Sequence, residues 1–173
     1  MRKEVRFAGF GGQGVILGAF VLGRAVSVHT TMHATMTQSY GPESRGGSCE
    51  ADVVIGDAEV DNPMVTRPDV LVLMSQEAAT KNMEAARTAS LLLADVDLVR
   101  LDEDVAEKAL RLPFTRTADA LGRRIVANMV MLGSFTKASG LVPRAAMEAA
   151  LRETVKPSTR ELNLKAFDAG VRL

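Results

Sequence analysis

A glycine-rich segment near the N-terminus constrains the fold of this chain more than any other feature of its sequence. The apolar run of residues 5–8 is typical of a strand, and the apolar run that begins at Val15 is typical of a helix. Between them Gly9, Gly11 and Gly14 follow the spacing G-x-G-x-x-G, which nucleotide-binding α/β folds place between a first strand and a first helix. The segment therefore predicts a strand–turn–helix unit at the start of an α/β fold.

Two uses of such a turn fit the spacing. Glycines adopt backbone conformations that are closed to other residues, and the free N–H groups at a helix N-terminus attract phosphate or carboxylate. Alternatively, the glycines only let the chain reverse tightly and pack the helix against its strand. The spacing alone leaves both interpretations open.

The rest of the chain alternates between the two kinds of element. The sequence predicts strands over residues 3–8, 30–40, 49–55, 70–74 and 89–94, a strand end over 110–115, a short helix or turn over 102–110, and helices over 15–28, 76–86, 116–138, 144–155 and 159–172. Strands that are nearly continuously apolar are typical of a parallel sheet covered on both faces. We expect a single Rossmann-like α/β domain over residues 1–173, with a mostly parallel sheet flanked by helices and the first strand at its centre.

Composition excludes several classes of function. Lys and Arg number 21, as do Asp and Glu, so no basic surface for nucleic acid is expected. We find no long uncharged apolar run and no signal peptide, so a cytoplasmic protein without a membrane segment is expected. The single cysteine, Cys49, excludes an internal disulfide and a four-cysteine iron–sulfur site within this chain.

Three self-sufficient chemistries fit the residues poorly. A dinucleotide-binding dehydrogenase needs an acidic residue about 20 positions after the glycines, whereas the first carboxylate after Gly14 is Glu43. A P-loop needs Gly-Lys-Ser or Gly-Lys-Thr, which is missing here. Cys49 with His29 or His33 would make a nucleophile and base, but a cysteine on an apolar strand is more often a small core residue.

A second unusual loop follows the second predicted strand and reads Tyr-Gly-Pro-Glu-Ser-Arg-Gly-Gly from Tyr40 to Gly47. Its glycines and proline indicate a loop of fixed shape. Glu43 and Arg45 within it form a surface ion pair, or else reach an anionic group on another molecule. A chain with binding loops and little acid–base apparatus resembles part of an active site.

The two loops together resemble the gamma subunit of the 2-oxoacid:ferredoxin oxidoreductases. The first loop, Gly-Phe-Gly-Gly-Gln-Gly at residues 9–14, and the second, whose family form is Tyr-Gly-Pro-Glu-Ala-Arg-Gly-Gly, carry the resemblance, with Ser44 at the variable position. Pro-Asp-Val-Leu-Val at residues 68–72 and Ser-Gln-Glu at residues 75–77 also look like that subunit. The resemblance covers essentially the whole chain. The sequence is most similar to that of the 2-oxoglutarate type, and the pyruvate, ketoisovalerate and indolepyruvate enzymes are related.

The resemblance implies a subunit that is inactive alone. Enzymes of this family decarboxylate a 2-oxoacid and form an acyl-CoA, using thiamine diphosphate, Mg, iron–sulfur clusters, CoA and ferredoxin as electron acceptor. The resemblance implies alpha and beta partner subunits, and in some enzymes a ferredoxin-like delta subunit. This chain is expected to hold no metal, no catalytic residue and no cofactor by itself, and to pack beside the active site of its partners.

The loop residues are the candidates for contact with CoA or with partner subunits. They are Gly9, Gly11, Gly12, Gln13, Gly14, Tyr40, Gly41, Pro42, Glu43, Arg45, Gly46 and Gly47. We expect both loops at the carboxyl edge of the sheet, where ligands of such folds bind. The alternative from another class is a free-standing nucleotide- or CoA-binding regulatory module.

Overall fold

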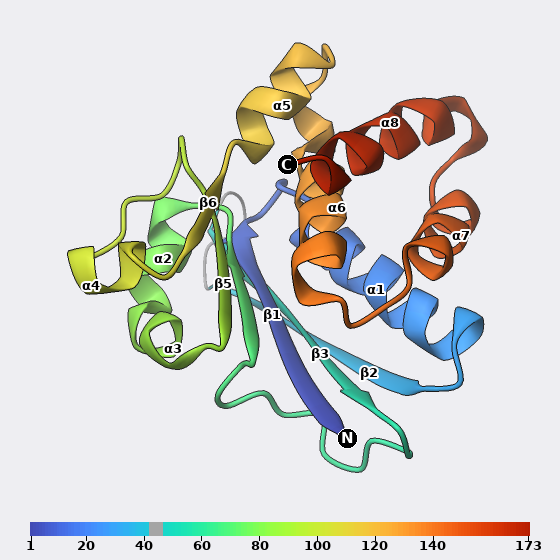
Figure 1. The fold of residues 1–173 in the computed structure, drawn as a ribbon, viewed down its shortest axis with the longest axis horizontal. Helices are drawn as coiled ribbons and strands as arrows, with labels where there is room; N and C mark the ends of the chain where they lie inside the picture. The colour runs from blue at the N-terminus through green and yellow to red at the C-terminus, as the bar shows by residue number, and fades with distance from the viewer. Residues whose placement is uncertain (42–46) are drawn as a thin grey trace.

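A computed structural model describes residues 1–41 and 47–173 and contains one six-stranded sheet with helices packed on it (Figure 1). The strands are β1 (Arg2–Phe10), β2 (His33–Tyr40), β3 (Ser48–Gly56), β4 (Val70–Leu73), β5 (Leu91–Asp95) and β6 (Leu110–Leu112). The α-helices are α1 (Val15–His29), α2 (Gln76–Lys81), α3 (Met83–Thr88), α4 (Glu103–Ala106), α5 (Phe114–Ala120), α6 (Ala127–Ser139), α7 (Arg144–Thr154) and α8 (Arg160–Val171). Two 3₁₀ turns complete the description, η1 (Arg124–Val126) and η2 (Pro157–Thr159).

The sheet has the order β2-β3-β1-β4-β5-β6 and is mostly parallel, with β1 inside it, as predicted. Only β3 runs against its neighbours: it is antiparallel to both β1 and β2, whereas β1, β4, β5 and β6 pair in parallel. The reason is the short connection between β2 and β3. A parallel crossover needs a dozen or more residues, and residues 41–47 are too few, so β2 and β3 form a hairpin.

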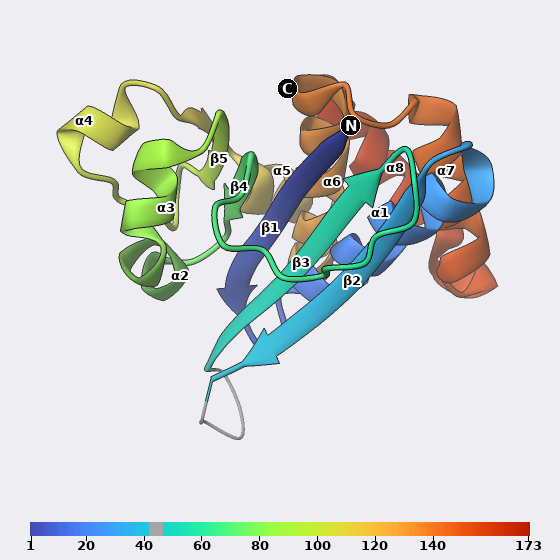
Figure 2. The same ribbon diagram turned by 90° about the horizontal axis from the view of Figure 1, so that it is seen from below.

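The first face of the sheet carries the main core. Helices α1, α6, α7 and α8 lie on this side (Figures 1 and 2), and their apolar side chains meet those of the central strands in one buried cluster. Phe7 of β1 packs edge-on against Phe135 of α6, with ring centroids 5.2 Å apart and planes at 84°. Val15, Ala19 and Leu22 of α1 belong to the same cluster, which holds α1 against the sheet and so fixes the position of the glycine turn that precedes it.

Helices also lie on the second face, as expected for a sheet flanked by helices, but they cover only part of it (Figure 2). Helices α2, α3 and α4 lie on the β4–β5 side, and residues 57–69 instead cross the β3 and β2 side (Figure 2). Polar side chains occupy β1 and β3 there: Arg6 donates to both carboxylate oxygens of Asp52 at 2.8 and 2.7 Å. Asn82 donates to Glu50 at 2.7 Å in the same cluster.

Two predicted helices are broken in the structure. The helix predicted over 116–138 is three elements, α5, η1 and α6, because Gly122 adopts a left-handed φ of 87° between them. The helix predicted over 76–86 is split into α2 and α3 at Asn82. The first break matters for the site, because it places Arg124 and Ile125 at the carboxyl edge of the sheet. No helix in the described part of the chain is long and apolar enough to cross a membrane.

Candidate functional site

The glycine turn joins β1 to α1 and needs its glycines for two different reasons. Gly12 and Gly14 have φ values of 104° and 74°, in the left-handed region that other residues rarely adopt. A Cβ on Gly9, whose φ is ordinary, would lie 2.4 Å from the Gln13 Oε1 atom. Backbone conformation thus favours glycine at residues 12 and 14, and the close approach of Gln13 favours it at residue 9.

The side chain of Gln13 connects the glycine turn to the end of the neighbouring strand β4. Its Oε1 accepts a hydrogen bond from the Phe10 N–H at 2.9 Å, and its Nε2 donates to the Met74 carbonyl just after β4 at 2.7 Å. The Gln13 N–H also donates to the Phe10 carbonyl at 3.1 Å. The sequence predicts that Gln13 contacts CoA or a partner subunit. In the structure its side chain stabilises the conformation of the loop.

The structure brings the two predicted loops together. The Gly11 N–H donates to the Gly47 carbonyl at 2.9 Å, and the Gly41 N–H donates to the Ser48 carbonyl at 2.7 Å. The described ends of the second loop therefore lie at the same carboxyl edge as the glycine turn, as expected. Tyr40, the last residue of β2, has an exposed fraction of 63% beside them. The other predicted loop residues, Pro42, Glu43, Arg45 and Gly46, lie outside the described residues.

The N-terminus of α1 opens into a hollow of about 250 Å³ between the loops. The hollow is lined by Phe10, Gly11, Gly12, Gly14, Val15, Ile16, Tyr40 and Cys49. Gly14 is the N-cap of α1, and no side chain within the described ranges caps the helix there. The first-turn N–H groups and the positive end of the helix dipole are thus available to an anionic group.

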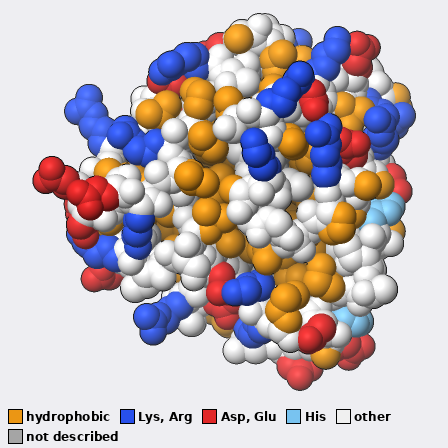
Figure 3. Space-filling model, viewed as in Figure 1, with side chains coloured by type: hydrophobic (Ala, Val, Ile, Leu, Met, Phe, Trp, Pro, Cys, Tyr) orange, Lys and Arg blue, Asp and Glu red, His pale blue; other side chains and the backbone are white. Residues whose placement is uncertain are grey.

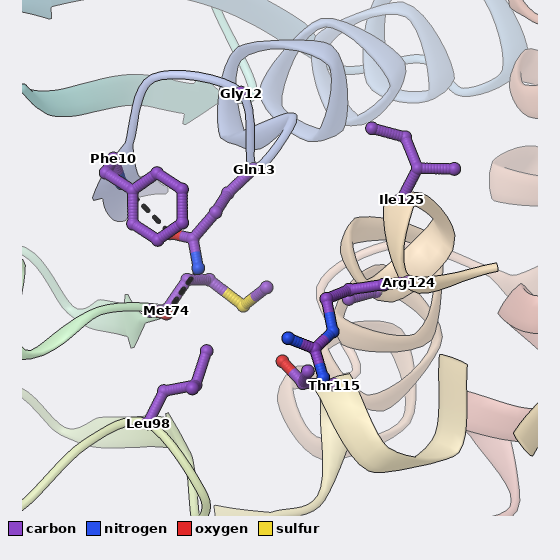
Figure 4. A pocket seen from close by; sticks show the side chains of 9 residues that line it. Phe10, Gly12, Gln13, Met74, Leu98, Thr115, Arg124 and Ile125 are labelled. Atoms are coloured by element: carbon purple, nitrogen blue, oxygen red, sulfur yellow. Dashed lines mark hydrogen bonds between the residues drawn. The ribbon is translucent and has the colours of Figure 1, made fainter. Parts of the chain in front are cut away.

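A larger cavity of about 260 Å³ lies on the other side of the turn (Figure 4). It is lined by Phe10, Gly12, Gln13, Met74, Leu98, Thr115, Arg124, Ile125 and Ala127. Figure 3 shows that apolar side chains gather in a band over the middle of the face seen in Figure 1. Of the cavity residues, Phe10, Leu98 and Ile125 are exposed, so an apolar ligand or partner surface fits here better than a compact ion.

Arg124 is the charged side chain of this cavity. Its Nε and an Nη atom donate to the two carboxylate oxygens of Asp119 at 3.1 and 2.7 Å. These hydrogen bonds and the negative charge of Asp119 raise the pKa of Arg124 above its ordinary value. The guanidinium is therefore a permanent, oriented cation at the mouth of the cavity.

Sequence reasoning missed the cavity residues outside the turn. Met74 and Leu98 follow the carboxyl ends of β4 and β5, and a search of positions after strand ends would have found them. Arg124 and Ile125 carry no such signal, because they lay inside a helix that the sequence predicted to be continuous. Only the break at Gly122 directs them to this edge.

The arrangement suits binding and lacks acid–base chemistry among the residues described. No described Asp or Glu lines either hollow. Burial, and then the nearby Glu50 carboxylate, raises the pKa of the Cys49 thiol, so it stays protonated at neutral pH. His33 lies at the far end of β2 from the Tyr40–Cys49 pair, seven residues or about 23 Å along the strand.

These positions agree with the sequence analysis, which disfavoured a cysteine–histidine dyad. The remaining histidine, His29, ends α1 and lies 3.3 Å from Glu153 of α7 rather than near Cys49. Across residues 1–41 and 47–173, no cluster of three or more His, Cys, Asp or Glu side chains could hold a metal ion. Among the described residues, the edge of the sheet offers free backbone N–H groups, an apolar rim and one oriented guanidinium.

Comparison with known proteins gives a consistent result. The family model for pyruvate ferredoxin/flavodoxin oxidoreductase matches residues 4–173. The 2-oxoglutarate synthase subunit KorC of Methanothermobacter marburgensis is 48% identical, over 98% of this chain and 95% of its own length. The KorC subunit of Methanocaldococcus jannaschii is 44% identical, over 98% of this chain and 92% of its own length.

A solved structure has the same fold over nearly the full length. The keto/oxoacid ferredoxin oxidoreductase gamma subunit from Geobacter sulfurreducens superposes with a TM-score of 0.84 and 34% sequence identity. The match covers 98% of this chain and 96% of that one.

Proposed function

This chain belongs to the pyruvate ferredoxin/flavodoxin oxidoreductase family as a gamma-type subunit, and we propose that it serves an enzyme that oxidises 2-oxoglutarate to succinyl-CoA. The similarity to KorC subunits over nearly the whole chain supports 2-oxoglutarate as the oxoacid. The partners we propose are alpha and beta subunits, a ferredoxin-like delta subunit, and ferredoxin as electron acceptor.

The observation that carries the proposal is the junction of the two loops at one edge of the sheet. The Gly11–Gly47 hydrogen bond joins them beside the uncapped N-terminus of α1. Such an N-terminus suits a phosphate group, and CoA carries phosphates. We propose that this junction contacts CoA or the partner subunits around it, through Gly9, Gly11, Gly12, Gln13, Gly14, Tyr40, Gly41, Pro42, Glu43, Arg45, Gly46 and Gly47.

The chemistry of the reaction is assigned to the partners. Thiamine diphosphate and Mg supply the decarboxylation when bound, and iron–sulfur clusters carry the electrons. One cysteine, buried and protonated, does not supply the ligand set of a cluster. The residues of this chain are proposed to bind and orient, and to shield the partner active site from water.

Reconstitution tests the proposal. We expect the isolated chain, supplied with all cofactors, to show no 2-oxoglutarate-dependent dye reduction, because no described carboxylate lines either hollow and one cysteine cannot hold a cluster. Addition to alpha and beta subunits should restore CoA-dependent turnover with 2-oxoglutarate preferred over pyruvate. A chain that copurifies with no larger subunits and binds CoA alone would instead support the regulatory-module alternative.

The substitution Arg45→Lys tests the binding role that the sequence predicts for the second loop. Lysine does not reproduce the planar fork of arginine, so loss of a bidentate charged contact should cost about 1.5–3 kcal/mol, or roughly ten- to hundredfold. We expect a higher apparent KM for CoA or weaker assembly, with folding intact. The matched control is Arg144→Lys, because Arg144 pairs with Glu148 and Asp168 on the helices α7 and α8. Unchanged KM and assembly in both variants would leave Arg45 only a surface ion pair with Glu43, worth about 0–1 kcal/mol.

A further inference from the structure

The outer strand β2 has a free edge. Within residues 1–41 and 47–173 it is first in the strand order and pairs with β3 only. Because the Gly41 N–H bonds to the Ser48 carbonyl, and bonded pairs alternate along an antiparallel ladder, odd-numbered residues of β2 direct their backbone groups toward β3. The even-numbered residues direct theirs outward: the Ala34 N–H donates to the Ser27 Oγ of α1 at 3.2 Å, and the backbone groups of Met36 and Gln38 find no partner among the described residues.

β2 also lacks the features that usually block pairing at an edge. Proteins protect edge strands by shortness, charge, proline or a bulge. The eight residues of β2, HATMTQSY, include no Lys, Arg, Asp, Glu or Pro, and the register with β3 is continuous from His33 to Tyr40. At the other edge, β6 has three residues and carries Arg111. One edge of the sheet is protected, and the other is open to a further strand.

An apolar groove of about 290 Å³ follows the same edge, between α1 and β2. Its lining is Phe20, Gly23, Arg24, Ser27, Val28, Ala34 and Met36. Phe20 is 49% exposed and Val28 57% exposed, and a Cβ on Gly23 would meet no atom within 4 Å. Large exposed apolar side chains thus lie next to unpaired backbone, a combination typical of an interface.

We propose that this edge is the interface with a second copy of the chain, the two β2 strands pairing antiparallel about a two-fold axis near Met36. Pairing Met36 with Met36 of the second copy, and the Gln38 N–H with the Ala34 carbonyl of that copy, satisfies outward groups of both strands and keeps every side chain on its own face. The Ala34 N–H keeps its hydrogen bond to the Ser27 Oγ. A two-fold axis brings the same strand opposite itself, and like charges directly opposite are unfavourable. The absence of Lys, Arg, Asp and Glu from β2 removes that penalty.

The expected spacing of the two α1 helices also supports a second copy of the chain at this edge. Helix α1 packs over β2 and β3, and paired strands are about 4.8 Å apart. In a continuous sheet the two α1 helices would therefore lie about two strand spacings, or roughly 10 Å, apart, close to the distance of packed helices. Phe20 and the open surface at Gly23 would meet their counterparts across the axis.

The oligomeric state of the isolated full chain tests the proposal, measured by sedimentation over a wide concentration range. Gln38→Pro removes an outward N–H without touching the β3 ladder, and proline is tolerated at such a position. Phe20→Lys places like charges across the axis. We expect a dimer for the wild type and a dissociation constant raised about tenfold or more in both variants. The matched control, Leu110→Lys at the β6 edge, should leave it unchanged.

Cross-linking identifies the molecule that pairs with β2. With Met36→Cys, a short bis-maleimide should join two copies of the chain, because their Cα atoms would be about 5.5 Å apart; Leu110→Cys should give no such product. A chain that is monomeric at all concentrations, with no Met36→Cys dimer, overturns the proposal. A Met36→Cys product formed only with a larger subunit in the assembled enzyme also overturns it, in favour of a partner strand. Circular dichroism shows that each variant is folded.

Discussion

Gly170→Ala is expected to destabilise the chain by roughly 3 kcal/mol or more, which corresponds to a fall in Tm of roughly 6–12 °C. Helices α6 and α8 cross at Gly133 and Gly170, and a Cβ on Gly170 would lie 1.9 Å from the Val130 carbonyl oxygen. A backbone oxygen cannot move aside as a side chain does, so the helices must separate. Separation also breaks the hydrogen bond from the Ser134 Oγ to the Gly170 carbonyl, now 2.9 Å.

Gly23→Ala is the matched control for this prediction. It is also a glycine inside a helix, but its Cβ would meet nothing within 4 Å. Alanine favours the helix over glycine by about 1 kcal/mol, so at concentrations where the chain is monomeric Gly23→Ala should stabilise it slightly. Thermal unfolding of both variants separates close packing from helix propensity. Equal Tm values for Gly170→Ala and the wild type would contradict the contact between α6 and α8.

Asp95→Ala is expected to cost about 3 kcal/mol and to loosen the cavity beside the glycine turn. Asp95 is fully buried at the end of β5. Its carboxylate accepts hydrogen bonds from the Thr115 N–H at 2.8 Å, the Thr115 Oγ1 at 2.6 Å and the Asp97 N–H at 2.9 Å. Without it the start of α5 loses its anchor, and the buried Thr115 hydroxyl loses its partner.

Arg116→Ala is the control in the same region. Arg116 pairs with Asp97, but its side chain is 70% exposed. Its removal should therefore lower the free energy of unfolding by at most about 1 kcal/mol. In urea unfolding, the free energy of unfolding of Asp95→Ala should be far lower than that of Arg116→Ala. Comparable losses would mean that the carboxylate of Asp95 does not anchor α5.

The first loop illustrates how much local sequence predicts. The spacing of Gly9, Gly11 and Gly14 between two apolar runs predicted the turn from β1 to α1, and the structure has it there. Local sequence could do this because the φ of 74° at Gly14, like that of 104° at the neighbouring Gly12, is open to few other residues. The role of Gln13 was not predictable, since its partner Met74 lies 61 residues further along the chain.

The sequence by itself determined the fold class, the family resemblance and the inner position of β1, because hydrophobic periodicity and turn glycines are local signals. Tertiary structure alone decided that Arg124 and Ile125 meet the glycine turn and that Cys49 lies far from His33. It also decided that helices leave the β2 edge open. Each of these depends on the direction in which a whole element leaves a turn, as at Gly122 and in the hairpin of β2 and β3. Such directions are set by packing between elements distant in sequence, which no local pattern of residues records.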